Sequence, residues 1–220
     1  MSTIPGTQGY AAEAPDLLER YERMGFAGAH FAVLDLIAPP PLDVLDIGAG
    51  TGRDAAWFAR RGDRVTAIEP TREMRDGAMA LHPEPNIEWI DDCLPNLMSM
   101  RGRTFDLVWM SAVWMHFDAK ERSQMMTTVE RLVRPGGALM ISLRHGPIPE
   151  GRRMFDVGAE ETAGLAHQFG FETVSAATFE STYAPGVTWD RLWFQKGLSA
   201  INRASKNKSP PDEPPSPSKA

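Results

Sequence analysis

The chain has 220 residues, 42% of them hydrophobic, which suits one domain with a full hydrophobic core. Its 29 acidic and 23 basic residues give a net charge of −6, so no broad basic field is available for a polyanion and nucleic acid is disfavoured as a partner. Cys93 is the one cysteine, which excludes an internal disulfide. No stretch reaches the ~18 apolar residues of a membrane span, and none has the pattern of a secretory signal. We therefore expect a cytoplasmic protein.

Two helical segments are predicted before the first strand. Apolar residues recur at helical spacing from Ala14 to about Met24, and Gly25 would end that helix. A second helical stretch, Ala29–Ile37, stops at a run of three prolines. Because both segments precede the sheet, residues 1–42 are expected to form an amino-terminal helical lid over the sheet edge.

The first strand leads into a glycine-rich turn. Val44–Ile47 is an apolar run typical of a buried strand, the glycines at positions 48, 50 and 52 indicate a tight turn, and Arg53–Arg61 is predicted to be a helix stopped by Gly62. A strand, a glycine turn and a helix N-terminus in this order indicate a nucleotide-cofactor site at the head of an α/β sheet.

Four more strands alternate with helices in the central part of the chain. The strands are predicted at Arg64–Glu69, Ile87–Ile90, Phe105–Met110 and Ala138–Leu143. A helix capped by Thr71 runs to Leu81, and a longer one covers Ala119–Arg134 and ends at a Pro-Gly-Gly turn.

The pattern changes after the fifth strand. A helix at Ala159–Phe169 is followed by two strands, Phe171–Phe179 and Thr188–Gln195, and a Pro-Gly loop between them predicts an antiparallel hairpin. The proline-rich stretch Ser205–Ala220 has no large apolar residue and is expected to be a disordered tail. The whole order predicts an α/β fold whose ligand binds outside the carboxyl ends of the strands.

The glycine spacing bears on the cofactor. Dinucleotide-binding turns read G-x-G-x-x-G, whereas Gly48, Gly50 and Gly52 are one residue tighter and follow Asp46. An acidic side chain at this place repels phosphate and attracts an amine, although Asp46 could instead only orient the turn.

Further acidic residues end the second and third strands. Glu69 is placed to accept both hydroxyls of a ribose, and Asp91 or Asp92 to accept an exocyclic adenine amine, with the backbone N–H of Cys93 or Leu94 donating to the ring. Together with the turn, these residues describe a site for an adenosine that carries an amino acid and no phosphate.

This set resembles the class I S-adenosylmethionine-dependent methyltransferases over residues 43–145. The matching motifs, in order, are Asp46–Gly52, Val65–Pro70, Asp91–Pro95, Phe105–Ser111 and Leu132–Gly137. The resemblance implies a three-layer, Rossmann-like, seven-stranded, mostly parallel sheet with the last strand antiparallel, and a methyltransferase domain over residues 43–200. The spacer after Asp91-Asp92 is shorter than in many relatives, which leaves open which aspartate faces adenine.

The resemblance implies S-adenosyl-L-methionine as cofactor and no metal. The residues expected to bind the cofactor are Asp46, Gly48, Ala49, Gly50, Gly52, Arg53, Glu69, Pro70, Asp91, Asp92, Cys93, Leu94 and Ser111. Arg53 is either a partner for the methionine carboxylate or a surface arginine.

Methyl transfer depends on alignment, and a general base is needed only where the acceptor atom enters protonated. His116 and His145 are the candidate bases, with a structural role as the alternative for each. The residues expected to bind substrate are Tyr21, Trp114, Met115 and Arg144, the first three with core packing as the alternative. Arg144 would suit an acceptor that carries a carboxylate or phosphate.

The expected function is therefore methyl transfer to a small-molecule acceptor by a monomer or homodimer. One alternative is a methyltransferase of protein or RNA that docks through Lys206, Lys208 and Lys219, and another is a non-catalytic sensor of the cofactor. The glycine spacing and Asp46 disfavour a nicotinamide dehydrogenase.

Overall fold

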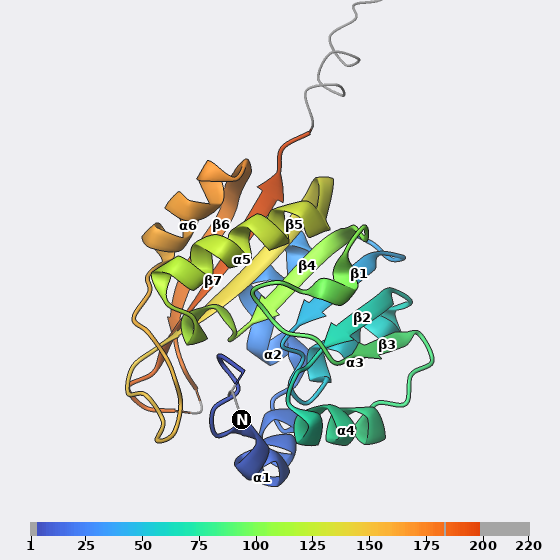
Figure 1. Ribbon diagram of the computed structural model, residues 1–220, viewed down its shortest axis with the longest axis vertical. Coiled ribbons are helices and arrows are strands. Elements are labelled where there is room, and N and C mark those ends of the chain that lie inside the picture. The colour runs from blue at the N-terminus through green and yellow to red at the C-terminus, as the bar shows by residue number, and fades with distance from the viewer. Residues whose placement is uncertain (1–3, 183, 199–220) are drawn as a thin grey trace, which may run out of the picture.

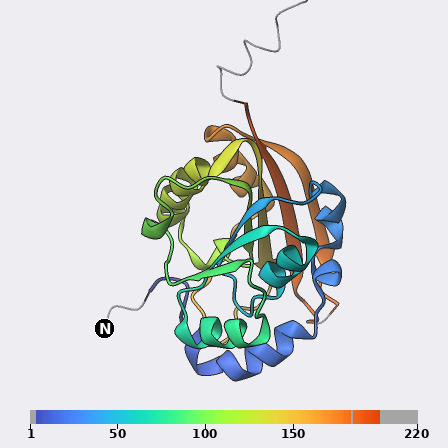
Figure 2. The ribbon, with the colours of Figure 1, turned by 90° about the vertical axis from the view of Figure 1, so that its right-hand side faces the viewer.

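The computed structural model describes residues 4–182 and 184–198, which form a seven-stranded sheet with helices on both faces (Figures 1 and 2). The strands are β1 (Asp43–Ile47), β2 (Arg64–Ile68), β3 (Ile87–Ile90), β4 (Phe105–Ser111), β5 (Val133–His145), β6 (Phe171–Glu180) and β7 (Thr188–Lys196). The predicted tail at 205–220 lies outside the described residues.

The helices alternate with the parallel strands. The α-helices are α1 (Tyr10–Glu22), α2 (Phe26–His30), α3 (Arg53–Arg61), α4 (Arg72–Leu81), α5 (Ala119–Leu132) and α6 (Ala159–Gln168). Short 3₁₀ helices are η1 (Phe31–Leu36), η2 (Met98–Met100) and η3 (Trp114–His116).

The strand order is β3-β2-β1-β4-β5-β7-β6. Strands β1 to β5 pair in parallel, whereas β7 is antiparallel to both of its neighbours, β5 and β6. This confirms the predicted architecture, including the terminal hairpin. The order reverses between β1 and β4, so the loops after these two strands meet at one place on the carboxyl edge.

Two hydrophobic cores fill the two faces of the sheet. On one face the apolar sides of α5 and α6 pack on the sheet through residues such as Met126 and Ala166. On the other face α2, η1 and α3 contribute Phe26, Val33 and Phe58. The two layers of helices hold the sheet in place, so the loops at its carboxyl edge start from rigid strand ends.

The amino-terminal helix α1 lies beside α4 at the carboxyl edge (Figure 1). Ala14 and Leu17 of α1 pack against Met74 of α4 in a small separate cluster. Only the first segment of the expected lid lies at this edge, because α2 and η1 pack on a face of the sheet through Phe26 and Val33. The division of the chain at residue 42 stays a prediction.

Several element bounds differ from the prediction. Helix α1 begins at Tyr10 rather than at Ala14, because its first turn is held by tertiary contacts that a periodicity cannot report. The second predicted helix splits into α2 and η1. Thr71 stands at the N-cap position of α4, but its side chain makes no capping hydrogen bond.

The predicted Pro-Gly-Gly turn lies within β5. Val133 already pairs with Phe105, and pairing resumes between Ala138 and Leu107, so the proline and glycines form an irregularity in the strand. Helix α5 therefore ends at Leu132 instead of continuing to position 134. A capping box between Asp118 and Glu121 fixes its other end.

Candidate functional site

The glycine loop between β1 and α3 requires its glycines. Gly48, Gly50 and Gly52 have φ angles of +72°, +58° and +82°, which side chains of L-residues rarely adopt. A Cβ atom at Gly48 would lie 2.6 Å from Cγ2 of Val113, and one at Gly52 would lie 2.6 Å from the Trp89 ring. The loop is thus packed closely against its neighbours on two sides.

Gly50 differs from the other two glycines. A Cβ atom there would meet nothing nearer than the Gly48 carbonyl oxygen at 4.0 Å. The loop therefore presents an open side at Gly50, where a ligand can approach the backbone closely.

Glu69 holds this loop against the end of β2. Its buried carboxylate accepts hydrogen bonds from the backbone N–H groups of Gly50 at 2.9 Å and Thr71 at 2.8 Å. Burial raises the pKa of Glu69, and the two backbone hydrogen bonds oppose that rise. The sequence did not predict this role, and the expected contact of Glu69 with ribose stays a prediction. Pro70 lies between Glu69 and Thr71 in the chain.

Asp46 is a buried carboxyl group at the end of β1. It is 1% exposed, and its Oδ2 atom has no hydrogen-bond partner among the described residues. Burial, reinforced by the nearby Asp54, raises the pKa of Asp46 well above its usual range. A buried carboxylate oxygen without a donor is costly, so this atom calls for a cationic or hydrogen-donating partner.

Asp54, in the first turn of α3, accepts hydrogen bonds from three side chains. Its carboxylate accepts from His30 Nε2 at 2.8 Å and from Trp109 Nε1 at 3.0 Å, and it pairs with Arg53. Burial opposes its ionisation, but His30 and Arg53 lower the pKa of Asp54 well below its usual range. Sequence reasoning missed both Asp54 and His30, since a lone polar residue on an apolar helix face carries no signal of its partners.

Arg53 is therefore largely buried and already has a carboxylate partner. Its Nε atom donates to Asp54 at 2.8 Å, and its guanidinium also lies near the carbonyl oxygen of Met24. Arg53 is therefore not a surface arginine. Its expected contact with a methionine carboxylate stays a prediction.

The loop after β3 divides the roles of its two aspartates. Asp92 accepts hydrogen bonds from the backbone N–H groups of Cys93 and Ser99, both at 2.7 Å, and so shapes its own loop. The Asp91 side chain is 66% exposed and pairs with Arg75 at 3.0 Å. Leu94 is buried behind them. Which aspartate faces adenine stays open.

His116 is buried in η3, after β4. Its Nδ1 atom lies 2.7 Å from the Arg153 carbonyl oxygen, and its Nε2 atom lies 3.1 Å from the Tyr10 hydroxyl of α1. Ser111 ends β4 just before this segment and pairs with Ser142 of β5. The structure thus brings His116 to the carboxyl edge and joins it to the amino-terminal helix.

His145 and Arg144 end β5 farther along the same edge. His145 donates from Nε2 to Asp190 of β7 at 2.9 Å, and Asp190 also accepts from Thr178. Arg144 donates to the Pro147 carbonyl oxygen at 2.9 Å. Asp190 is a partner that sequence reasoning did not identify.

The remaining predicted substrate residues lie mainly in packed surroundings. Trp114 and Met115 are fully buried in the core under α5, which favours the packing alternative. Tyr21 packs on the small cluster between α1 and α4, with the Arg20 guanidinium over its ring. Their contact with an acceptor stays a prediction.

The end of α1 is fastened to the glycine loop. Glu22 accepts from the Thr51 hydroxyl at 2.6 Å and lies 3.2 Å from Nε2 of His82. Burial opposes ionisation of Glu22, but the hydrogen bonds from His82 and Thr51 outweigh it and lower the pKa of Glu22. Helix α1 therefore contacts both the cofactor side and the His116 side of the edge.

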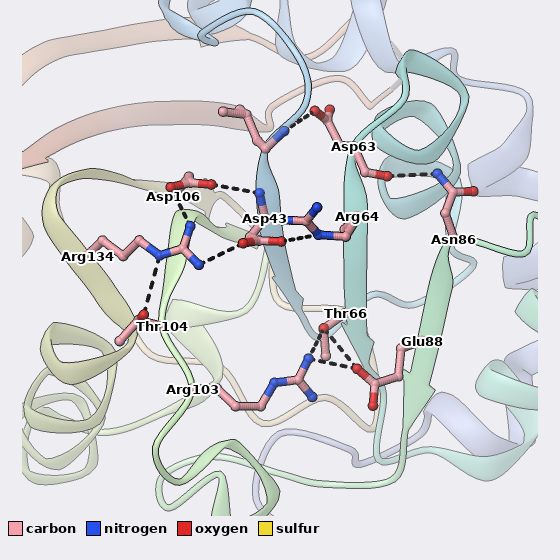
Figure 3. Close-up of polar contacts among 11 residues, drawn as sticks. Asp43, Asp63, Arg64, Thr66, Asn86, Glu88, Arg103, Thr104, Asp106 and Arg134 are labelled. Atoms are coloured by element: carbon pink, nitrogen blue, oxygen red, sulfur yellow. Dashed lines mark hydrogen bonds and ion pairs between the residues drawn. The ribbon is translucent and has the colours of Figure 1, made fainter.

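The opposite, amino edge of the sheet carries a network of ion pairs (Figure 3). Arg134 bridges Asp43 and Asp106, while Arg64 also pairs with Asp43. Farther along, Arg103 pairs with Glu88 and donates to Thr66. Apart from Asp106, these residues line a cavity of about 580 Å³.

Within the described residues, no group of three or more His, Cys, Asp or Glu could hold a metal ion. Nor does the part of the chain that the structure describes include a helix long and apolar enough to cross a membrane.

Residues 44–137 match a family model described as a methyltransferase domain. The chain is 29% identical over 98 residues to an uncharacterized methyltransferase of Alkaliphilus oremlandii, covering 44% of each chain. It is 29% identical over 126 residues to the methyltransferase GfsG of Streptomyces halstedii, covering 56% of this chain and 40% of that one. The chain thus spans less than half the length of these relatives.

Comparison with solved structures reports the same fold. An N1-methyltransferase of Burkholderia thailandensis with bound 1,6-didemethyltoxoflavin and S-adenosylhomocysteine has a TM-score of 0.68 at 20% identity, covering 86% of this chain and 85% of that one. The [4+2]-cyclase SpnF also has a TM-score of 0.68, at 17% identity, covering 90% of this chain and all (100%) of that one. Since the fold occurs both in an N1-methyltransferase and in a [4+2]-cyclase, the fold alone does not decide the reaction.

Proposed function

We propose that this protein transfers a methyl group from S-adenosyl-L-methionine to a small-molecule acceptor, because residues 44–137 match a methyltransferase family model and the sheet has the expected Rossmann-like architecture. The observation that carries this proposal is the buried Asp46 Oδ2 atom, which has no hydrogen-bond partner among the described residues and comes two positions before the glycine loop that is open at Gly50. An amino group would donate a hydrogen bond to this oxygen. A phosphate would be repelled by an ionised Asp46 and would find no positive charge at a protonated one.

The residues present fit such a cofactor. Asp46 and the loop at Gly50 would hold its amino-acid end, and Glu69, fixed by two backbone hydrogen bonds, would accept the ribose hydroxyls. When bound, S-adenosylmethionine supplies the activated methyl group. The protein then has to align the acceptor and exclude water, which the closely packed loop and α1 favour.

The acceptor is proposed to be small for a structural reason. Helix α1 covers the carboxyl edge and is fastened at Glu22 to the glycine loop and at Tyr10 to the loop after β4. A covered site suits a small molecule better than a folded protein or RNA, and the net charge of −6 adds no attraction for nucleic acid. We further propose a cytoplasmic monomer or homodimer, in keeping with the single cysteine.

Calorimetric titration with S-adenosylmethionine tests the cofactor. We expect saturable binding that Asp46→Asn weakens, and no comparable binding of NADH. Absence of heat at millimolar S-adenosylmethionine would overturn the proposal.

A transfer assay then separates an enzyme from a sensor. Carbon-14-labelled S-adenosylmethionine is incubated with the protein and a metabolite extract, and labelled products are identified by chromatography. We expect a labelled small molecule. Tight cofactor binding without any labelled product would favour the sensor.

A further inference from the structure

Tyr10 meets His116 across the junction between α1 and the loop after β4. The Tyr10 hydroxyl oxygen lies 3.1 Å from His116 Nε2, and the two rings are nearly perpendicular at 80°. Tyr10 is absent from the residues that the sequence predicted for the site, because 106 positions separate it from His116.

The hydrogen bonds define which nitrogen of His116 carries the proton. A carbonyl oxygen can only accept, so Nδ1 donates to Arg153 at 2.7 Å and Nε2 is left with a lone pair. The Tyr10 hydroxyl therefore donates to Nε2. Burial, together with the charges of Arg152 and Arg153, lowers the pKa of His116, so its imidazole is neutral at neutral pH and keeps the Nε2 lone pair that accepts from Tyr10.

Tyr10 is braced from the other side by Arg152. The Arg152 guanidinium lies 4.1 Å from the centre of the Tyr10 ring and makes two contacts of 2.9 Å with Glu13. Burial raises the pKa of Tyr10, and nearby Tyr21 and Glu69 add to that rise. Tyr10 is therefore a protonated, fixed phenol that is near enough to Glu69, at the end of β2, to be influenced by its charge.

We propose that Tyr10 and His116 form a proton relay for the methyl transfer, in which Tyr10 contacts the acceptor and His116 accepts the proton through it. This inference rests on the proposed function. It also names the acceptor class, because a relay is useful only where the nucleophilic atom enters with a proton, as a hydroxyl or an amine N–H does.

The acceptor atom forms a bond to the transferred methyl carbon, and the electron pair of the broken carbon–sulfur bond stays on sulfur. The acceptor proton moves to the Tyr10 oxygen as the Tyr10 proton moves to His116 Nε2. The resulting imidazolium keeps its Nδ1–H bond to the Arg153 carbonyl oxygen.

The relay predicts a dependence on pH, since a protonated His116 cannot accept from Tyr10. The titratable and charged groups around the pair come from four elements: Glu13 and Tyr21 of α1, Arg152 and Arg153 after β5, Asp118 and Glu121 at the start of α5, and Glu69 at the end of β2. Because the pKa of His116 is lowered, the rate of methyl transfer should fall only at a pH below about 6.5, the ordinary pKa of histidine.

Single-turnover transfer of carbon-14 methyl from S-adenosylmethionine to the metabolite extract, measured from pH 5 to 9, tests the relay. Tyr10→Phe keeps the ring and its Arg152 contact but removes the hydroxyl. We expect its transfer rate to fall by about 100-fold or more, as for loss of a general base, with the acidic limb of the profile lost and the calorimetric cofactor affinity unchanged within about twofold.

Glu13→Gln is the matched control, because it loosens the Arg152 brace and keeps the hydroxyl and the imidazole. We expect it to retain the acidic limb with a rate within about threefold of wild type. If Tyr10→Phe transfers as fast as Glu13→Gln, the relay is wrong while the methyltransferase proposal stands. If the wild-type protein labels no acceptor at all, both fail.

Nitrogen-15 NMR of the histidine rings gives a second measurement that needs no acceptor. We expect His116 to be neutral with the proton on Nδ1 at pH 7, and its Nε2 resonance to shift in Tyr10→Phe. An Nε2–H tautomer or an imidazolium at pH 7 would overturn the relay.

Discussion

Two aspartates of one short strand show how the two edges of the sheet differ. Asp43, at the amino edge, has its pKa lowered to about 2 because Arg64 and Arg134 donate to it. Asp46, three positions later at the carboxyl edge, is buried with an oxygen that no donor reaches within residues 4–182 and 184–198, and its pKa is raised well above the usual range. The same residue type is thus stabilised as an anion at one edge and destabilised at the other.

The surroundings of each aspartate follow the same division. At the amino edge, charged side chains of β1, β2, β4 and β5 form ion pairs with one another (Figure 3). Buried polar atoms without a hydrogen-bond partner among the described residues occur on both sides: Asp46 Oδ2 and His30 Nδ1 near the carboxyl edge, and Arg61 Nη2 and Glu84 Oε2 in the segments that lead into β2 and β3. Asp46 Oδ2 differs from the others in its place just before the glycine loop, where a ligand that approaches Gly50 could supply the missing partner.

The largest effect is expected from Asp54→Ala. The substitution leaves His30, Arg53 and Trp109 as buried donors without their acceptor, which should cost about 3–5 kcal/mol of unfolding free energy. Urea unfolding followed by circular dichroism measures it. A loss below about 1 kcal/mol would mean that the buried network contributes no more than a surface ion pair.

Gly48→Ala should destabilise the loop by about 1–3 kcal/mol, through its φ of +72° and the approach of the new Cβ atom to Val113. Gly50→Ala is the matched control, since its φ is also positive but its Cβ atom would meet open space. Urea unfolding of Gly48→Ala alone and together with Val113→Ala separates the clash from the backbone strain. Equal losses for Gly48→Ala and Gly50→Ala would argue against the clash.

Asp46→Asn should separate ligand binding from stability. Loss of a charge-assisted contact worth ~1.5–3 kcal/mol predicts cofactor binding that is about 10- to 100-fold weaker in calorimetry. The raised pKa means that the folded state favours the protonated acid, so wild-type stability falls as pH rises from about 4 through the folded pKa. The asparagine variant should lack that fall in urea unfolding between pH 4 and 8. Identical pH profiles for the two proteins would contradict the assignment.

Asp43→Asn should have the smallest effect, about 1 kcal/mol or less at neutral pH, because its ion pairs are partly exposed and screened by salt. Its lowered pKa gives the opposite sign to Asp46: the stabilisation is present above pH 4 and is lost as pH falls towards 2. Thermal unfolding at low and high salt between pH 2 and 7 checks both points. A larger loss than for Asp54→Ala would reverse the proposed contrast between the edges.

Local patterns predicted much of the fold. Helix α3 and strand β3 have the predicted bounds, because an apolar period flanked by glycine or proline is a local property. The seven-stranded, mostly parallel sheet and the antiparallel terminal hairpin also agree with the prediction, whereas the strand order came only from the structure. The early start of α1 at Tyr10 and the extension of β5 back to Val133 did not follow from the sequence, since distant partners stabilise both ends.

For the site, residue types and spacing determined the glycine loop, the acid before it and the position of the cofactor edge. Only the tertiary structure decided that Glu69 holds Gly50, that Asp54 gathers His30 and Trp109, and that Tyr10 reaches His116. The physical reason is that backbone turns and periodicities arise from neighbouring residues, whereas the partner of a buried polar side chain is set by the packing of segments far apart in the chain.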